Sequence, residues 1–352
     1  MNKTPFYSVI MPVYNCEDLV NQAVDNLNKQ TVKSFEVIFV NDGSKDNTLE
    51  KLNLKLQQAT FKYKVLSQEN AGPGEARNNG IKCASGNYIL FVDADDYLEP
   101  NAIEILISNA ENTMADVILF GYFQDFYTSE TKIDHTVTVV PQSQLLTDNK
   151  FVVSKVSALD QNKVFSFAWN KAIKRDLILE NDIVFSKRMH SEDYFFYIDL
   201  FYHVNSLSVI DKPIYHYVKS PRETLTNQPY IKNFYKLITD RYLAMQNILK
   251  SRQVYHGEIA ANAANTHIKH IFSHFSNNCS RYSGLKGKDI RCDIKATLED
   301  SITKEAIALA QGGSKAQKIM NIILKTNSVW LCFLFAKVIC FSRNSKLFDK
   351  MK

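Results

Sequence analysis

Residues 86–100 read GNYILFVDADDYLEP, a short apolar run that breaks into three carboxylates within four positions. Tyr88 to Asp93 has the β-branched and aromatic character of a buried strand. Carboxylates this close together repel one another, so a bound cation is the economical reason for gathering them at a strand end. The sequence therefore predicts a divalent-metal site at Asp93 and Asp95. The alternative is a solvated acidic turn that caps the helix after Pro100.

Further runs of the same kind alternate with helical patterns on both sides of this strand. Such alternation is typical of βαβ units, which form a mostly parallel sheet with right-handed crossovers. We therefore expect an α/β fold. The expected strands are Tyr7 to Val13, Phe35 to Asn41, Tyr63 to Ser67, Tyr88 to Asp93 and Asp116 to Tyr122, then a strand or hairpin over Phe123 to Val140 and two short strands near Leu207 to Ile210 and Pro213 to Val218.

Polar turns follow the first three expected strands. In open α/β sheets ligands bind at the carboxyl ends of strands, so these turns should face one crevice. Asp42 can accept hydrogen bonds from a base or ribose there, although a plain turn and helix cap over Asn41 to Asn47 is the simpler explanation of this segment alone. Glycines in Asn70 to Gly80 permit close approach of a ligand. Arg77 would lie near the positive end of the next helix, where a diphosphate is favoured.

A second acidic pair, Glu192 and Asp193, begins an amphipathic pattern over Glu192 to His203, with Ser191 as the expected N-cap. Acidic residues in a first turn are commonly structural, because the helix dipole favours them. The alternative role of this pair is that of a general base, which needs a carboxylate within hydrogen-bond reach of a hydroxyl.

The length and charge of the chain indicate two parts. A chain of 352 residues exceeds one usual domain, so we expect a catalytic domain over residues 1–227 and a mainly helical region over residues 228–352. After residue 228 the chain has 20 Lys and Arg against 8 Asp and Glu, whereas residues 1–228 have 22 against 29. No stacking aromatics or known module accompany the basic charges, which excludes nucleic acid as a partner.

The cysteines and the start of the chain favour a cytoplasmic location. The six cysteines form no CxxC pair, and the residues after Met1 lead directly into the first expected strand without an apolar signal segment. Near the other end, Val329 to Phe341 is apolar but contains Lys337, and its 13 residues fall short of the roughly 20 that span a bilayer. This segment either lies in the interface of an anionic membrane or packs as a buried helix, and the sequence favours neither. His267, His270 and His274 share one helix face and are expected at the surface rather than on a metal.

Six segments in this order resemble family 2 glycosyltransferases with the GT-A fold, over roughly residues 5 to 225. They are SVIMPVYN (8–15), FVNDGSKDNT (39–48), ENAGPGEARNNGI (69–81), GNYILFVDADDYLEP (86–100) and the pair WNKAIKRD (169–176) and HSEDYFF (190–196). The ordered series is far more specific than any single motif. The resemblance implies a Rossmann-like domain that binds a nucleotide-diphosphate sugar, most often with uridine.

The resemblance also implies a donor site. Pro12, Tyr14 and Asp42 would surround the nucleoside, Arg77 would approach the base or diphosphate, and a basic segment that includes Lys219 and Arg222 would cover the diphosphate, although KSPRETLT (219–226) departs from the usual arrangement. The implied donor-binding residues are Pro12, Tyr14, Asp42, Arg77, Asp93, Ala94, Asp95 and Arg222.

The implied chemistry is a metal-dependent transfer with inversion. Asp95 would be the main ligand of Mn²⁺ or Mg²⁺ with Asp93 as the second, Asp193 would be the base that deprotonates the acceptor, and Glu192 would shape the site. The implied acceptor is a saccharide or lipid-linked saccharide in capsule or exopolysaccharide synthesis, at the inner face of the cell membrane.

Two other functions share some of these sequence features. A catalytically silent nucleotide-sugar binder or membrane-docked partner subunit is compatible with the same motifs, and so is a homo-oligomer. A nicotinamide-dependent oxidoreductase is excluded because no GxGxxG follows the first strand. The sugar, the linkage and the acceptor depend on pocket shape, which no motif reports.

Overall fold

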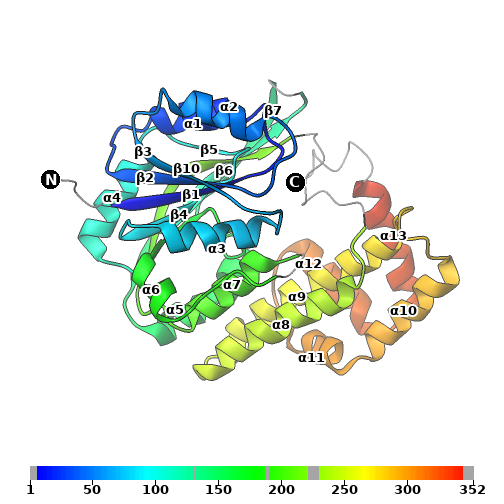
Figure 1. Cartoon of the computed structure of the whole chain (residues 1–352). Helices are drawn as coiled ribbons and strands as arrows, with labels where there is room; N and C mark the ends of the chain where they lie inside the picture. The colour runs from blue at the N-terminus through cyan, green and yellow to red at the C-terminus, as the bar shows by residue number, and fades with distance from the viewer. Residues whose placement is uncertain (1–5, 130–131, 188–189, 221–229, 344–352) are drawn as a thin grey trace. The chain divides into compact units, whose positions relative to one another are not determined.

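A computed structural model describes residues 6–129, 132–187, 190–220 and 230–343. The chain forms two compact units, one of Met1–Val152 and Val164–Pro221 and the other of Val153–Lys163 and Arg222–Lys352 (Figure 1). The predicted boundary between residues 227 and 228 lies outside the described residues, so it stays a prediction. The second unit also takes in residues 153–163, which sequence patterns did not separate from the catalytic domain.

The first half of the sheet is parallel, as predicted. It consists of β1 (Tyr7–Val13), β2 (Phe35–Asn41), β3 (Lys62–Ser67) and β4 (Tyr88–Phe91), in the order β3-β2-β1-β4. The first two strands have the predicted bounds, and every residue of β2 is buried. Their carboxyl ends therefore lie along one edge, where the predicted site residues follow them.

Beyond β4 the sheet is mixed. β9 (Lys171–Lys174) runs antiparallel between β4 and β6 (Val117–Tyr127), and β10 (Leu207–Lys219) is parallel to β6. The two short strands expected near residues 207–218 are one strand, because register shifts around Pro213 bend β10 without ending it. The predicted hairpin over residues 123–140 is formed by β6 and β7 (Ile133–Val139). Smaller strands on β10 are β5 (Tyr97–Leu98) and β8 (Gln144–Leu146).

Helices cover the sheet on both faces. Figure 1 shows α1 and α2 on one side and α3 on the other. The buried face of α1 is apolar, which explains the helical spacing of Val20, Ala23, Val24 and Leu27. The helices of this unit are α1 (Val20–Asn28), α2 (Thr48–Leu56), α3 (Pro73–Cys83), α4 (Ala102–Thr113), α6 (Arg175–Glu180) and α7 (Glu192–Phe201). The helix α5 (Asn149–Gln161) begins in this unit and continues into the second from Val153.

The start of α7 corrects one expectation. Ser191 occupies the N-cap position, but its φ of 62° is left-handed and its side chain makes no cap hydrogen bond to the helix. A capping serine needs an extended backbone to aim its oxygen at the first turn. The acidic pair at the start of α7 therefore has no serine cap beside it.

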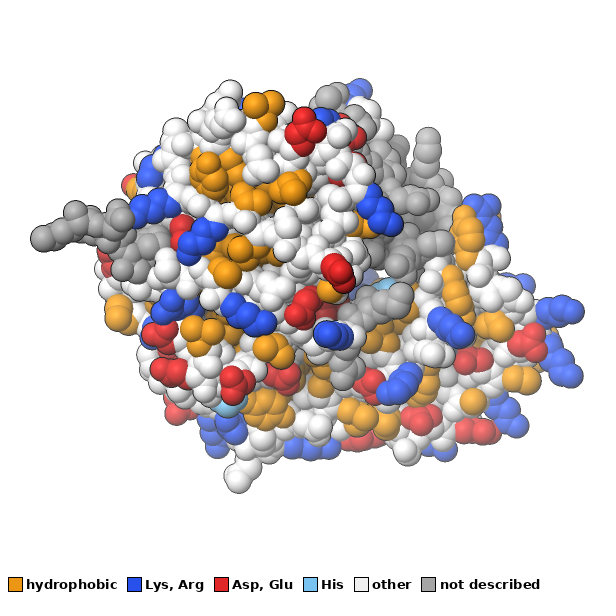
Figure 2. Space-filling view, in the orientation of Figure 1, with side chains coloured by type: hydrophobic (Ala, Val, Ile, Leu, Met, Phe, Trp, Pro, Cys, Tyr) orange, Lys and Arg blue, Asp and Glu red, His pale blue; other side chains and the backbone are white. Residues whose placement is uncertain are grey.

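The second unit is helical, as predicted. The 22-residue α9 lies at its centre, with α8, α11, α12 and α13 packed on it. Figure 2 shows basic and hydrophobic side chains next to one another over this unit on the face in view. None of its described helices has the length and apolar character needed to cross a membrane. The helices are α8 (Phe234–Ser251), α9 (Gly257–Asn278), α10 (Gly287–Glu299), α11 (Ser301–Leu309), α12 (Lys315–Lys325) and α13 (Val329–Arg343).

The histidines of α9 are not surface residues, contrary to expectation. His267 and His274 are 1 % and 4 % exposed, because α9 is surrounded by other helices and has little free surface. His267 stacks on Tyr242 at 4.4 Å between ring centroids, and His274 lies 2.7 Å from a carboxylate oxygen of Asp293. These histidines are part of the core of the second unit.

Candidate donor and base site

Asp42, directly after β2, holds the loop that leads into α3 through hydrogen bonds. One carboxylate oxygen accepts hydrogen bonds from Gln68 Nε2 at 2.7 Å and from the Ala71 amide at 2.8 Å, and the other accepts from the Gly72 amide at 2.9 Å. Gly72 has a φ of +89°, which a residue with a side chain rarely adopts, so a glycine is needed there. Asp42 is 3 % exposed, and its predicted contact with a nucleoside would have to compete with these bonds.

Two other predicted nucleoside residues lie at the carboxyl end of β1, Pro12 within the strand and Tyr14 directly after it. Pro12 is half-buried, whereas Tyr14 is 45 % exposed and offers a large ring at the strand end. Beneath them α3 lies close to the sheet: a Cβ at Gly80 would come within 2.4 Å of an Ile10 methyl. Gly80 therefore lets α3 pack closely against β1, whereas the sequence suggested that the glycines of this segment let a ligand come close to the backbone.

Arg77 is the centre of the candidate site. It lies on α3 and is 4 % exposed, and its two terminal nitrogens donate to two carboxylates. Nη2 is 2.8 Å from Asp93 Oδ1 after β4, and Nη1 is 2.9 Å from Asp193 Oδ1 on α7. The arginine thus joins the predicted metal segment to the predicted base, a residue 116 positions further along the chain.

The charges of this cluster are strongly coupled. Burial opposes ionisation of Arg77, but the carboxylates of Asp193 and Asp93 raise its pKa well above the ordinary value, so the guanidinium stays charged. Burial raises the pKa of Asp193, and Arg77 acts in the opposite direction. Burial and the neighbouring Asp193 raise the pKa of Glu192 to about 7. Glu192 is therefore protonated more readily than an ordinary glutamate, with Asp193 as a coupled neighbour.

The backbone of Phe167 and Ala168 orients Asp193, and we call it, with the side chains that hold it, the clamp. Its Oδ2 accepts from the Ala168 amide at 3.2 Å. The carbonyl of Ala168 accepts from the Tyr197 hydroxyl at 2.8 Å, and the carbonyl of Phe167 accepts from Lys171 Nζ at 2.9 Å. Lys171 is fully buried, with Nζ 4.0 Å from the centre of the Tyr197 ring. Lys171 and Tyr197 have no local sequence signal for this role, although both fall within or beside the segments that carried the resemblance.

The third carboxylate of the acidic run has a separate place. Asp96 is 4 % exposed and accepts from the Tyr215 hydroxyl at 2.7 Å and from the Val218 amide at 2.8 Å, both on β10. The Tyr215 oxygen also accepts from the Asp93 amide at 3.2 Å. Burial, followed by the charges of Asp95 and Asp93, raises the pKa of Asp96 well above its ordinary value. Asp96 therefore anchors the acidic segment to β10 and does not face the other two carboxylates as a ligand.

Asp93 and Asp95 are left as the predicted metal ligands. The side chain of Asp93 is 30 % exposed, with Oδ1 bonded to Arg77, Ala94 is half-buried, and Asp95 is exposed. In the described part of the chain, no three His, Cys, Asp or Glu side chains gather into a metal-binding group. Mg²⁺ and similar hard cations are usually held by one or two carboxylates together with substrate phosphates, so the exposed Asp95 and the half-buried Asp93 at a strand end fit that chemistry.

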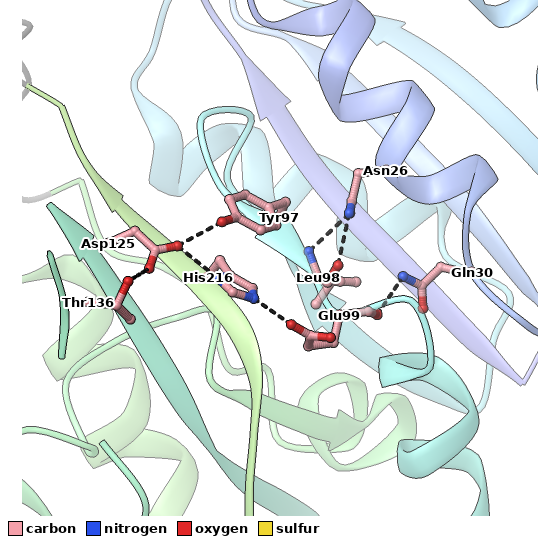
Figure 3. A network of polar contacts seen from close by, with 8 residues as sticks. All are labelled: Asn26, Gln30, Tyr97, Leu98, Glu99, Asp125, Thr136 and His216. Atoms are coloured by element: carbon pink, nitrogen blue, oxygen red, sulfur yellow. Dashed lines mark hydrogen bonds and ion pairs between the residues drawn. The ribbon is translucent and has the colours of Figure 1, made fainter. Parts of the chain in front are cut away.

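A second network holds the strand that follows the acidic segment, as Figure 3 shows. The two ring nitrogens of His216 lie 2.7 Å from Asp125 Oδ2 and 2.7 Å from Glu99 Oε1. Tyr97 donates to the same Asp125 oxygen at 2.7 Å, and its ring stacks on His216 with centroids 4.1 Å apart. Thr136 donates to Asp125 Oδ1 at 2.6 Å. The network ties β5, β6, β7 and β10 together directly after Asp96, and it contains no residue singled out from the sequence.

The fold thus brings Arg77, Asp93 and Asp193 into direct contact, with Glu192 beside them. Arg222 lies outside the described residues, so its predicted place over the diphosphate is not part of this geometry. Contacts of Pro12, Tyr14, Asp42, Arg77 and Ala94 with a donor stay predictions.

Comparisons with known proteins agree with this architecture. The family described as Glycosyl transferase family 2 matches residues 8–178. The putative glycosyltransferase EpsH of Bacillus subtilis is 32 % identical over 218 residues, 61 % of this chain and 61 % of EpsH. The uncharacterized glycosyltransferase EpsJ of the same organism is 27 % identical over 86 % of both chains.

A solved structure shares the fold. It is residues 1–349 of TarS from Staphylococcus aureus in complex with UDP-GlcNAc, with a TM-score of 0.62 and 23 % identity over 94 % of this chain and 90 % of that one. The predicted GT-A-type α/β fold with C-terminal helices is therefore confirmed. The sequence match thus identifies residues 8–178 as a region of the glycosyltransferase family 2 type, and the solved structure shows the shared fold.

Proposed function

We propose that this chain is an inverting, metal-dependent glycosyltransferase that moves a sugar from a UDP-sugar to a hydroxyl of a saccharide or lipid-linked saccharide in polysaccharide synthesis. The observation that carries the proposal is Arg77, which links the donor-side Asp93 to the base candidate Asp193 through two charge-assisted bonds. Because one buried arginine bonds both the donor-side carboxylate and the candidate general base, these two groups have a fixed mutual position, as a single-displacement reaction requires.

The donor would bind at the carboxyl ends of β1, β2 and β4. Tyr14 offers an exposed ring on which the nucleobase of the donor would stack, and Asp93 and Asp95 would hold Mn²⁺ or Mg²⁺. When bound, such an ion stabilises the charge that develops on the departing diphosphate. Arg77 keeps Asp93 oriented by bonding one of its oxygens, while Asp96 fixes the same segment through β10.

Asp193 is suited to the role of base. Each of its oxygens accepts one hydrogen bond, from Arg77 and from the Ala168 amide, so lone pairs remain for the acceptor hydroxyl. In the transfer, the acceptor oxygen forms a bond to the anomeric carbon as the bond to the diphosphate breaks, and the hydroxyl proton passes to Asp193. The displacement inverts the anomeric centre and releases the nucleoside diphosphate.

The choice of donor and acceptor draws on relatives. TarS binds UDP-GlcNAc in its solved complex, and a related sequence is named poly(ribitol-phosphate) beta-N-acetylglucosaminyltransferase. These names support a UDP-sugar donor and a polymeric acceptor for this chain. The matched region is 47 % of that TarS sequence, so the activity of the whole relative is not carried over.

Calorimetric titration tests the donor part. UDP, UDP-sugars, GDP and NAD are titrated with and without Mn²⁺ into the native chain and into Asp95→Asn. Metal-dependent binding of UDP or a UDP-sugar that weakens at least tenfold in the variant is expected. Absence of binding by every nucleotide would contradict the proposal.

Turnover of the bound UDP-sugar tests the base. Asp193→Asn should lower kcat about 10²- to 10⁴-fold with UDP affinity kept, since general base catalysis contributes that much. Asp199→Asn, an exposed aspartate on the same helix, is the matched control and should stay close to the native rate. Unchanged turnover in Asp193→Asn would instead favour a silent nucleotide-sugar binder.

A further inference from the structure

The outer face of α13 is an exposed apolar surface. Five large apolar side chains of this helix are between 47 % and 78 % exposed, and at about 100° per residue they fall within one arc of roughly 100°. The opposite side of the helix is buried against α9 and α10 through Cys332, Phe333 and Ala336. The exposed residues are Trp330, Leu331, Leu334, Val338 and Phe341. An apolar stripe of this width usually faces a core or a partner.

The neighbouring helix α12 has a similar surface. Ile319 and Ile322 are 50 % and 64 % exposed, and Lys315, Lys318 and Lys325 are exposed around them on the same side of the helix. α12 and α13 pack on one another and on α9, so the two surfaces belong to one unit. We call these seven apolar residues of α12 and α13 the apolar face.

The segment that carries the apolar face has charges of one sign. From Ala306 to Arg343 the sequence contains no Asp or Glu, and it contains four lysines and one arginine. Lys337 lies beside the stripe on α13, and Arg291 of α10 stacks on Trp330 at 4.5 Å.

We propose that α12 and α13 dock the chain on an anionic lipid bilayer, with the apolar face in the headgroup region and the lysines on the lipid phosphates. A tryptophan, aliphatic side chains and flanking lysines with no acids are the composition that such interfacial helices need. Long lysine side chains can keep their ammonium groups among headgroups while their stems lie along the apolar surface.

The charge also argues against a second copy of the chain as the occupant. In a two-fold symmetric interface each copy would present the same cations to the other, without a carboxylate between Ala306 and Arg343 to pair them. A span is excluded by length, since α13 has 15 residues and crossing a bilayer takes about 20.

Vesicle flotation tests the docking. The full chain is mixed with vesicles of phosphatidylcholine alone or with 30 mol % phosphatidylglycerol, a composition of about one anionic lipid in three. Binding to the anionic vesicles only is expected, with a loss of at least tenfold in the combined variant Leu334→Ser, Val338→Ser and Phe341→Ser. The matched control is Leu54→Ser, Ile133→Ser and Val184→Ser, three exposed apolar residues of the first unit, and it should bind as the native chain does.

A second pair of variants keeps the apolar face intact. Lys318→Gln with Lys325→Gln should weaken binding to anionic vesicles at least threefold, and high salt should remove this difference. Trp330 gives a direct signal, because the chain's other tryptophan, Trp169, is 3 % exposed. Its emission should shift to the blue on binding, and Trp330→Phe should abolish the shift.

Three outcomes would overturn the proposal: equal binding to neutral and anionic vesicles, unchanged binding of the Leu334, Val338 and Phe341 variant, or a change from dimer to monomer in that variant without any vesicle binding by the native chain. Circular dichroism of each variant shows whether it is folded. Titration with UDP separates this proposal from the enzymatic one, since the docking variants should bind nucleotide like the native chain.

Discussion

Lys171 is a buried cation that lies near the carboxylate of Asp193. Its ammonium group donates to the Phe167 carbonyl and to Asn170 Oδ1, at 2.9 and 2.6 Å, and it lies over the Tyr197 ring. A buried lysine is costly unless its charge is compensated. The nearby carboxylate of Asp193 compensates it, and in return the lysine favours the ionised form of that carboxylate.

We expect Lys171→Met to move the acidic limb of the kcat/KM profile to higher pH. Burial already raises the pKa of Asp193, and removal of the lysine charge raises it further, so ionised base is available only at higher pH. The pH dependence of sugar transfer measures the shift. Lys174→Met, on the same strand but paired with Asp116 at the surface, should leave the limb in place.

A uniform loss of rate at all pH values in Lys171→Met would contradict this explanation and leave a purely structural role. Arg77 and Glu192 face Asp193 as well, with Asp93 beyond the arginine, and all three are kept in both variants.

At the level of elements, the helix α9 has a titratable residue in its core. His267 is 1 % exposed and stacks on Tyr242, and burial lowers its pKa to about 4. The folded state therefore holds the neutral ring. The contribution to stability is fully present above the unfolded pKa of 6.5 and is lost as pH falls from there to about 4.

Acid should therefore destabilise the second unit. A shift of this size corresponds to a loss of about 3 kcal/mol at most between pH 7 and pH 4. His267→Phe keeps the ring stack without a titrating group, so its unfolding free energy in urea should fall less over this range. His256→Phe, which changes an exposed histidine directly before α9, is the control. Equal pH dependence of the native chain and His267→Phe would show that other groups dominate.

The elements also show what can be predicted from sequence. β1 and β2 were predicted to the residue because each is a continuous apolar run ended by polar turn residues, a purely local signal. The pair formed by Asp96 and Tyr215, 119 residues apart, is a property of the sheet order and has no local signal. The clamp from Lys171 and Tyr197 is of the same kind.

Errors in the prediction have physical causes too. Ser191 looked like a helix cap by residue type, but its left-handed backbone turns the hydroxyl away from that role. The histidines of α9 were expected at the surface because helical spacing predicts that they share one face of the helix, but it does not show whether that face is buried. At the site, strand ends and acidic residues were predictable, whereas the bridge through Arg77 needed the packing of α3 against α7.

For the whole molecule, the two units have separate cores and opposite net charge. Residues up to 228 carry an excess of acids, and the remainder an excess of bases. Donor-site residues lie in the first unit, and the apolar face lies in the second. Ligands for the two sites should therefore stabilise different parts of the chain.

Thermal unfolding followed by tryptophan emission checks this separation. In Trp330→Phe the remaining Trp169 reports on the first unit. UDP with Mn²⁺ at about 100 times its Kd should stabilise that unit by about 2.7 kcal/mol, seen as a higher midpoint. The complementary variant Trp169→Phe reports on the second unit, whose midpoint should rise less. Equal shifts in both variants would mean that the units unfold together.

The bridge through Arg77 has a consequence for how the protein is made. During synthesis the chain appears from its N-terminus, so α3 and β4 leave the ribosome more than a hundred residues before α7. Until Asp193 arrives, the guanidinium has only Asp93 as a partner and its other side is open to water. A nascent or truncated chain can thus complete its first four parallel strands and still lack the working site. Sugar transfer, unlike nucleotide binding, then becomes a late event in biogenesis, and its onset marks a chain whose catalytic unit is finished.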